Sequence, residues 1–242
     1  MNRFYYDLHV HSCLSPCGDN ESTPDSIAGM AELNGLNIVA LTDHNSTKNC
    51  PAFAYAAKNH GITPIFGMEL TTSEDIHMVC LFSSLDDAMA FDGEIEKQII
   101  KVKNKPAVFG NQFVVDHNDN VMGEIEHLLI NATALSLDDA KELTEKFGGV
   151  CYPAHIDRTS NSTTSVLGVF PNGFKIAELH DKTKLKEFAA FSGLSSDNII
   201  ISSDAHYLWD ISEKENFLML DADYNDTEQI VKCLFERLHN PI

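Results

Sequence analysis

His9 and His11 stand two residues apart at the end of the first predicted strand, which runs from Tyr5 to Val10. Side chains alternate along a strand, so both imidazoles lie on one face. Two imidazoles in that position can chelate a metal ion, and histidine is the commonest metal ligand in proteins. A lone pair of this kind is more often structural, so its interpretation depends on which other ligands gather beside it.

Further segments carry His, Asp or Glu beside a predicted strand. They are Thr42-Asp43-His44, Gly67-Met68-Glu69, His77, Ala154-His155 and Ser203-Asp204-Ala205-His206. Ionised carboxylates are costly to bury unless they are paired or bound to a metal. So many sites of the same residue types at the same topological place are hard to explain as core packing. They predict a multinuclear metal site.

Apolar runs separated by helical patterns must bring these residues together. The predicted strands cover residues 5–10, 38–41, 62–66, 77–82, 150–154, 175–179 and 199–202. The predicted helices cover residues 24–34, 51–59, 85–103, 136–147, 183–192 and 227–239. This alternation predicts an α/β fold with a parallel sheet and outer helices. About seven strand–helix units favour a closed or nearly closed barrel, whose chemistry lies at the carboxyl ends of its strands.

Local signals mark helix ends and single out the middle of the chain. Thr23 precedes one predicted helix as its N-cap, and Ser136 with Asp139 forms a capping signal for another. Residues 113–123 predict a small hairpin. We interpret roughly residues 85–135 as an elaboration on a single barrel domain of residues 1–242, and as the element that shapes substrate specificity.

The composition restricts the partners. Of 242 residues, 43% are hydrophobic, and Asp plus Glu (36) exceed Lys plus Arg (17) to give a net charge of −19. So acidic a chain is expected to bind neither long nucleic acid nor an anionic membrane. A small phosphorylated substrate or short nucleotide remains compatible, because metal ions can reverse the local charge. Without a visible signal peptide, membrane span or paired cysteine motif, we expect a cytoplasmic protein whose six cysteines are free.

The ligand motifs, taken in order, carry a family resemblance. The series His9-x-His11, Thr42-Asp43-His44, Gly67-x-Glu69, Ala154-His155 and Ser203-Asp204-x-His206 resembles the PHP family, named for polymerase and histidinol phosphatase. The resemblance extends from Tyr5 to about Trp209. It implies a distorted (β/α)7 barrel, two or three divalent metal ions (zinc, manganese or iron) and phosphoester hydrolysis. The chain looks closer to short stand-alone members, some of which act on nucleotide phosphates.

The same resemblance implies which residues bind the metals. The three ligand sets are His9, His11, Glu69 and Asp204; then Glu69, His77 and His155; then Asp19, His44 and His206. Asp19 is preferred to Cys17 because a hard oxygen ligand suits a manganese, iron or zinc phosphatase site better than a thiolate does. Cys17 stays open as the alternative ligand.

These residues together predict a metal-dependent phosphoesterase that hydrolyses a small phosphorylated metabolite or nucleotide through a metal-bridging hydroxide. Glu69 and Asp204 are expected to serve catalysis as well as metal binding, and Arg158 to grip a phosphate group. Asp7 and Asp43, each near a metal-binding histidine, could orient an imidazole or hold the strand end. No organic cofactor is expected.

Two other classes stay open. One is a non-catalytic module of the same fold that binds metals only for stability, although such a module would be expected to lose ligands. The other is a hydrolase of C–N bonds on a related metallo-barrel. That chemistry often uses a carbamylated lysine as bridging ligand, whereas Glu69 occupies the expected bridging position here.

Overall fold

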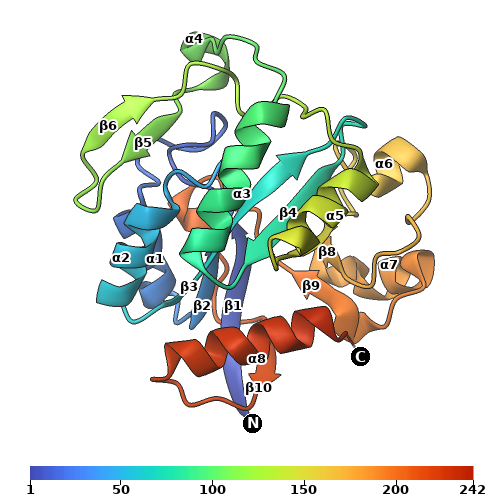
Figure 1. Cartoon of the computed structure of the whole chain (residues 1–242). Coiled ribbons are helices and arrows are strands. Elements are labelled where there is room, and N and C mark those ends of the chain that lie inside the picture. The colour runs from blue at the N-terminus through green and yellow to red at the C-terminus, as the bar shows by residue number, and fades with distance from the viewer. Residues whose placement is uncertain (242) are drawn as a thin grey trace.

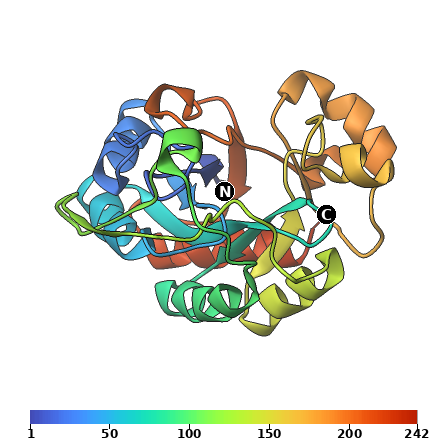
Figure 2. The same ribbon diagram turned by 90° about the horizontal axis from the view of Figure 1, so that it is seen from above.

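The computed structural model describes residues 1–241, in which seven strands curve into an incomplete barrel flanked by helices (Figures 1 and 2). Around the ring they are β1 (Asn2–Val10), β2 (Ile38–Leu41), β3 (Thr63–Thr71), β4 (His77–Phe82), β7 (Val150–Pro153), β8 (Ala177–Leu179) and β9 (Ile199–Ile201). A further strand, β10 (Phe217–Leu220), pairs antiparallel with β1. The predicted α/β fold, a distorted TIM-like barrel, is confirmed.

The ring of strands has two seams without a continuous ladder. One sheet has the order β10-β1-β2-β3-β4-β7, while β8 and β9 form a separate parallel pair. Backbone hydrogen bonds bridge both seams. Ile156 N–H donates to Glu178 O over 2.8 Å, and His11 N–H donates to Ala205 O over 2.9 Å. These bonds complete the ring at the end where the predicted ligands lie.

The strand β4 runs opposite to its neighbours, so the expectation of a wholly parallel sheet is wrong. It pairs antiparallel with β3 and β7, and His77 stands opposite Thr71. Only residues 72–76 join β3 to β4, and so short a connection permits a hairpin but no parallel crossover. The reversal places His77, the first residue of β4, beside the carboxyl end of β3.

Helices cover the outside of the sheet and one end of the barrel (Figures 1 and 2). The longer ones are α1 (Pro24–Leu33), α2 (Cys50–Asn59), α3 (Leu85–Gln98), α5 (Leu137–Lys146), α7 (Leu185–Ser192) and α8 (Thr227–His239). The shorter ones are α4 (Pro106–Phe109), α6 (Thr163–Leu167) and the 3₁₀ turns Lys182–Lys184, Ser196–Asn198 and Leu208–Asp210. Thr23 caps α1, and Ser136 with Asp139 forms a capping box on α5, as predicted.

The middle of the chain departs from the predicted long helix. α3 ends at Gln98, where residue 99 turns extended and packs with Leu14 and Leu129. The predicted hairpin is confirmed as β5 (Phe113–Val115) and β6 (Val121–Glu124). This hairpin and α4 lie above the carboxyl ends of β1 to β3 (Figure 1). Within residues 1–241, no helix is both long and apolar enough to cross a membrane.

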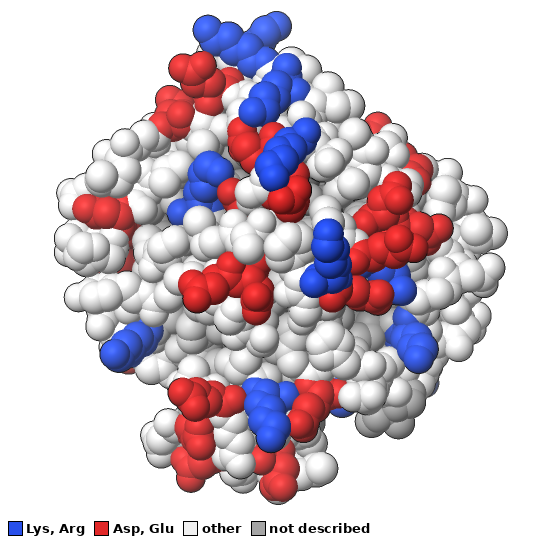
Figure 3. Space-filling model, in the orientation of Figure 1, with Lys and Arg blue, Asp and Glu red and all other residues white. Residues whose placement is uncertain are grey.

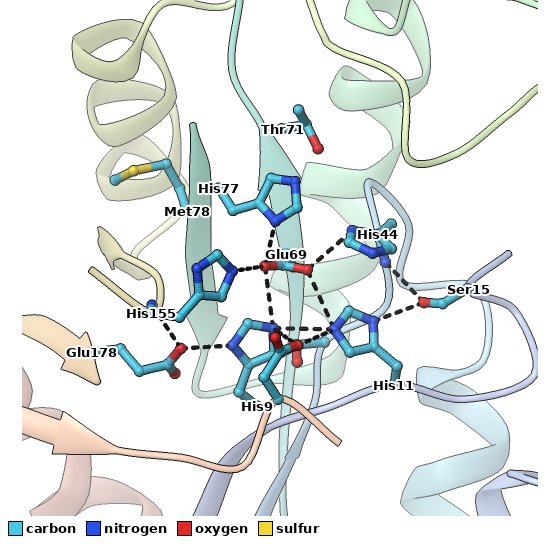
Figure 4. A network of polar contacts seen from close by, with 12 residues as sticks. His9, His11, Ser15, His44, Glu69, Thr71, His77, Met78, His155 and Glu178 are labelled. Carbon is cyan, nitrogen blue, oxygen red and sulfur yellow. Dashed lines mark hydrogen bonds and ion pairs between the residues drawn. The ribbon is translucent and has the colours of Figure 1, made fainter. Parts of the chain in front are cut away.

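Apolar side chains pack on both sides of the strands. Phe4, Tyr6 and Leu8 of β1 belong to an inner cluster with α8, whereas Val10 packs outward with α1 and α2. Leu8 and Val10 face opposite ways although they are two residues apart. The pairing of β1 with β2 slips between Asp7 and Val10, which accounts for the change of face. The irregularity turns His9 and His11 toward the barrel interior (Figure 4).

Candidate metal centre

The predicted ligands converge at the end of the barrel where Ile156–Glu178 and His11–Ala205 backbone bonds complete the ring (Figure 4). His9, Glu69 and His77 lie in β1, β3 and β4. The others lie in the segments that follow β1, β2, β7 and β9: His11, His44, His155, Asp204 and His206. All of these side chains are buried except that of His206, which is partly exposed. Residues from both ends of the chain thus surround one small volume.

His9 and His11 are oriented by acceptors on the side that faces away from this volume. Nδ1 of His9 lies 2.8 Å from Oε1 of Glu178, and Nδ1 of His11 lies 2.8 Å from Oγ of Ser15. Ser15 Oγ in turn donates to Asp43 over 2.7 Å. These partners select the tautomer with a proton on Nδ1. The two Nε2 atoms, 3.1 Å apart, therefore present lone pairs to the same space.

Glu69 is fully buried in the middle of the cluster. Five imidazole nitrogens surround its two oxygens, from His77 (2.7 Å), His155 (2.9 Å), His44 (3.0 Å), His11 (3.3 Å) and His9 (3.4 Å). Burial raises the pKa of a carboxyl group, but these histidines outweigh it, His77 foremost, and hold the pKa of Glu69 well below its usual range. Glu69 is therefore an anion shared by several potential ligands.

Asp204 approaches the same space from the segment after β9. Its Oδ1 lies 3.1 Å from Nε2 of His11 and 3.3 Å from Nε2 of His9. The backbone φ is +52° at Asp204 and +26° at His155, in a region that residues other than glycine rarely adopt. Such strain persists where the surrounding structure enforces it, and it gathers at functional sites. The strained backbone at Asp204 and His155 thus helps to place both side chains.

The histidines of the cluster differ in their affinity for protons. Burial lowers the pKa of each imidazole, but at His9 the carboxylates of Glu178 and Glu69 outweigh it and raise the pKa well above the usual value. At His11 the Asp204 and Glu69 carboxylates raise the pKa to about 9. Burial prevails at His206 and lowers its pKa to about 4, with repulsion from His11 adding to the effect. Protons and a metal cation would compete for the same Nε2 atoms.

Three overlapping sets of atoms, each within 4.8 Å of one another, could hold metal ions. The sets are His9, His11, Glu69 and Asp204; His44, Glu69 and His77; and His11, His44 and His206. The first coincides with the first predicted ligand set. His155 is absent from these sets, although its Nε2 lies 2.9 Å from Glu69. Each assignment to a particular metal stays a prediction.

The chemistry of the site fits a divalent cation. Nε2 of His44 and Nδ1 of His155 are buried without a hydrogen-bond partner, and Nδ1 of His44 and Oε2 of Glu69 contact one another without hydrogen-bond geometry. Buried polar atoms in proteins are otherwise nearly always hydrogen-bonded. Mixed imidazole and carboxylate donors suit zinc, manganese or iron.

Asp19 lies beside the third set of atoms without joining it. Its backbone N–H donates to His206 O over 2.9 Å, while its carboxylate accepts from the backbone N–H of Glu21. Cys17 is an exposed free thiol. Within residues 1–241, neither side chain belongs to a set with metal-binding spacing. The ligand role of Asp19 stays a prediction.

A cleft of about 540 Å³ opens beside Asp204. Arg158, His180 and Lys182 line it together with the acidic residues Asp210, Glu213 and Glu215. Nη2 of Arg158 lies 3.0 Å from Oδ2 of Asp204, so the guanidinium reaches the metal centre itself. A substrate entering this cleft would meet positive side chains next to the ligands.

Sequence reasoning missed two orienting residues, Glu178 and Ser15. Glu178 stands between apolar residues in a strand, and a lone carboxylate in such a strand is the signal that could have identified it. Asp43, considered as an orienting residue, acts on His11 through Ser15. Asp7 instead accepts backbone N–H bonds from Ser203 and Ser212, which secures the chain beside β1.

Comparison with known proteins agrees with this geometry. The PHP domain family model matches residues 7–151, more than half of the chain. An error-prone DNA polymerase from Symbiobacterium thermophilum is 39% identical over 77 residues, which make up 32% of this chain and 7% of the polymerase. A 5'-3' exoribonuclease from Haemophilus influenzae is 37% identical over 79 residues, 31% of this chain and 28% of that enzyme. The matches thus span a small part of these relatives' own lengths.

A solved structure extends the likeness of the fold to nearly the whole chain. The lesion-specific endonuclease PfuEndoQ from Pyrococcus furiosus has a TM-score of 0.64 at 17% identity, covering 97% of this chain and 56% of that one. At such low identity the comparison concerns the fold alone.

The expectation that long nucleic acid is excluded as a partner is wrong. Endonuclease Q was solved in complex with a 27-mer duplex substrate with an abasic lesion at the active site. That structure has a TM-score of 0.60 at 16% identity and covers 96% of this chain and 57% of its own. Net charge averages over the whole surface, whereas binding depends on the charge around the site. A charge of −19 therefore does not exclude a nucleic-acid substrate.

Proposed function

This chain belongs to the PHP domain family, and we propose that it is a metal-dependent hydrolase of phosphoester bonds in nucleic acid. One observation carries the proposal. Nε2 of His9, Nε2 of His11 and the carboxylates of Glu69 and Asp204 face one buried space. Four acceptor groups so close together repel one another unless protons or metal cations lie between them, and this donor set of imidazoles and carboxylates is the one that binds divalent metals.

Two or three divalent ions are proposed, held by the sets around His9, His44 and His206. His155, whose Nε2 contacts Glu69, is proposed as a further metal ligand. Zinc, manganese and iron are the candidates. When bound at such a site, divalent ions polarise the phosphoester and make water acidic enough to react near neutral pH.

The side chains around the ligands have separate tasks in this proposal. Glu178 and Ser15 hold the Nδ1 protons of His9 and His11, so that the Nε2 lone pairs keep their direction. Arg158 reaches the centre from the cleft wall and binds non-bridging phosphate oxygens. Its present partner, Asp204, would then be released to the metal.

His180 is the proposed proton donor to the leaving group. It lines the cleft with Arg158, and its Nδ1 lies 2.8 Å from Ser203 O. A proton on Nδ1 is fixed by that bond, which leaves Nε2 to exchange a proton with the leaving oxygen. Its exposed position suits a group that must recover its proton from water.

Nucleic acid is favoured as the substrate class by the relatives. The error-prone polymerase, the 5'-3' exoribonuclease and endonuclease Q all act on nucleic acid by their names. The cleft is open to solvent beside the ligands and can admit a strand end or an internal phosphate. A C–N hydrolase is less well supported, because the central anion here is Glu69 rather than a modified lysine.

The proposal is tested with purified protein loaded with zinc, manganese or iron. Substrates are bis-p-nitrophenyl phosphate, p-nitrophenyl phosphate, 5'-phosphorylated DNA and RNA oligonucleotides, and a duplex with an abasic site. We expect metal-dependent hydrolysis of at least one oligonucleotide, abolished in Asp204→Asn. Metal-loaded protein that cleaves none of these substrates would overturn the proposal and favour a non-catalytic module.

A further inference from the structure

The end of α3 and the residues that follow it carry a charge opposite to that of the whole chain. Lys97, Lys101, Lys103 and Lys105 lie within nine positions, and residues 97–115 contain no Asp or Glu. The chain as a whole has 36 acidic and 17 basic residues. This run of lysines, whose neighbours Glu94, Glu96 and Glu126 carry the nearby carboxylates, would attract an anion to this place on an otherwise acidic protein.

Two of these lysines are free of ion pairs. Lys97 pairs with Glu94 and Lys101 with Glu96, at 2.8 Å and 2.7 Å. Lys103 and Lys105 are exposed, and no carboxylate of residues 1–241 comes within 4.0 Å of either ammonium group. Their charges are therefore available to a ligand.

The lysine segment, which we define as residues 101–109, lies on the same end of the molecule as the metal centre. Residues 99–104 run beside residues 126–133, with bridges at Ile99–Thr133 and Lys103–His127. Asn45, next to the ligand His44, binds this second segment through 2.6 Å and 2.8 Å bonds to Leu129 O and Asn131 O. Figure 3 shows basic side chains at this upper edge, with acidic side chains beside them, over the region of α3 and α4 labelled in Figure 1.

The other end of the lysine segment approaches the loop that follows His11. The backbone of Gly110 packs so closely on Pro16 O that there is no room for a Cβ at this position. Phe113 N–H donates to Cys13 O over 2.9 Å. The segment is thus held between two loops that carry metal-centre residues, one beside His11 and one beside His44.

Apolar side chains accompany the lysines. Val108 is 71% exposed and Phe109 is 42% exposed, both on α4. Exposed aromatic groups next to a positive track are characteristic of proteins that bind single strands, because the rings stack on bases while lysines contact phosphates.

We propose that the lysine segment binds a single-stranded nucleic acid whose scissile phosphate lies at the metal centre; this rests on the proposed function. Lys103 and Lys105 contact backbone phosphates, and Phe109 stacks on a base. The polymer would cross the upper edge of the molecule, so that the segment selects long strands over small phosphoesters.

Binding is measured by fluorescence anisotropy with a labelled 20-nucleotide single strand, with EDTA present so that no turnover occurs. The double variant Lys103→Glu/Lys105→Glu is compared with Lys58→Glu/Lys232→Glu, which changes the net charge equally but near the opposite end of the barrel. We expect the first to weaken binding on the order of tenfold at 0.1 M salt and to lower the salt slope by about 1.4, or 0.7 per lost phosphate contact. The second should change neither quantity.

Several results would overturn the inference. One is that both double variants weaken binding equally, and another is that the first double variant does not weaken it. A third is that Lys103→Glu/Lys105→Glu weakens binding of a 20-base-pair duplex as much as binding of the single strand. Phe109→Ala should weaken single-strand binding severalfold without changing the salt slope. An unaltered affinity in that variant removes the stacking role.

A second measurement separates this inference from the proposed function. In the metal-loaded protein, Lys103→Glu/Lys105→Glu should cleave bis-p-nitrophenyl phosphate normally but the 20-nucleotide strand more slowly. Should the wild-type protein hydrolyse no phosphoester and yet bind the strand through these lysines, the proposed reaction fails and the binding surface stands. Should it hydrolyse the strand with no effect of the lysines, the reaction stands and the binding surface fails.

Discussion

The metal centre and the lysine segment lie at the same end of the barrel but are built in opposite ways. Every side chain around Glu69 is buried and fixed by neighbours from several strands. Residues 101–109 are exposed almost throughout and are held mainly by backbone bonds. The metal centre holds a few side-chain atoms in fixed positions, whereas the lysine segment spreads positive charge along several exposed residues.

This difference separates chemistry from selection of substrate. Buried ligands tolerate little displacement, because each one is also a neighbour of the others. Exposed lysines act through the summed field and tolerate change one at a time. Substitutions should therefore have large, all-or-none effects at the centre and small, additive effects in the segment.

The largest effect is expected for His9→Ala. Nε2 of His9 lies within 3.5 Å of Glu69, Asp204 and His11, so its loss removes a proposed ligand and one neighbour of each carboxylate. Metal content should fall and turnover should drop by about a thousandfold or more. Elemental analysis and a rate assay on the same sample check this, and a variant with full metal content and normal rate would contradict the whole picture of the centre.

Metal affinity should depend steeply on pH, whereas nucleic-acid binding by the lysine segment should not. The carboxylates that raise the pKa of His11 to about 9 favour a proton on it whenever the metal is absent. Below pH 9 the metal must displace that proton, so affinity should fall as pH falls, by about tenfold per pH unit for each displaced proton. Competition titrations with a chelator at pH 6, 7 and 8 measure the slope, and equal affinities at the three values would be the contrary result.

Glu178→Gln tests whether substitution of a residue outside the proposed ligand set also lowers metal affinity. The variant keeps an acceptor for His9 Nδ1–H but removes the charge that strengthens the imidazole as a ligand. We expect metal affinity or activity to fall by about 10- to 100-fold. Isothermal titration with zinc supplies the readout, since a merely structural role would lower thermal stability and leave the affinity of folded protein unchanged.

Arg158→Ala should give an intermediate result, because this side chain belongs to the open cleft rather than to the buried cluster. KM for the phosphoester should rise roughly tenfold, the loss expected for a charged hydrogen bond, with smaller change in bound metal. Arg158→Lys serves as the matched control, since it keeps the charge but loses the bidentate geometry. Identical KM values in all three proteins would remove Arg158 from substrate binding.

The smallest effect is expected in the hairpin beside the lysine segment. Met122 is 68% exposed on β6, so Met122→Ser should change the free energy of unfolding by less than about 0.5 kcal/mol. Leu8→Ala in the inner core should cost about 2–5 kcal/mol. Urea denaturation of both variants tests this contrast, which disappears if the two changes destabilise the protein alike.

That these residues gather in one cluster could be predicted because residue type and strand period together are informative. His9 and His11 follow an alternation of two, and Glu69, His155 and Asp204 stand where apolar runs end. Glu178 gives a weaker signal, a single carboxylate inside an apolar run. A lone Glu in a three-residue strand resembles a surface residue until the strand is known to face the barrel interior.

The elements that the sequence did not predict depend on distant contacts. Ile99 continues the helical pattern of α3, yet it leaves the helix to pack with Leu14 and Leu129. The direction of β4 follows from pairing with β3, which the apolar pattern of residues 77–82 does not encode. The strand β10 was missed because its short run, Phe217–Leu220, becomes a strand only against β1.

The bonds that join Ala205 to His9 and His11 also have a consequence for biosynthesis. A ribosome delivers the chain from its N-terminus, so β1 through β7 leave the exit tunnel well before Asp204 does. Until then the nascent chain holds its imidazoles around Glu69 without the second carboxylate. Completion of the centre thus waits until residue 204 has left the ribosome, and a chain terminated before that residue cannot form the finished site.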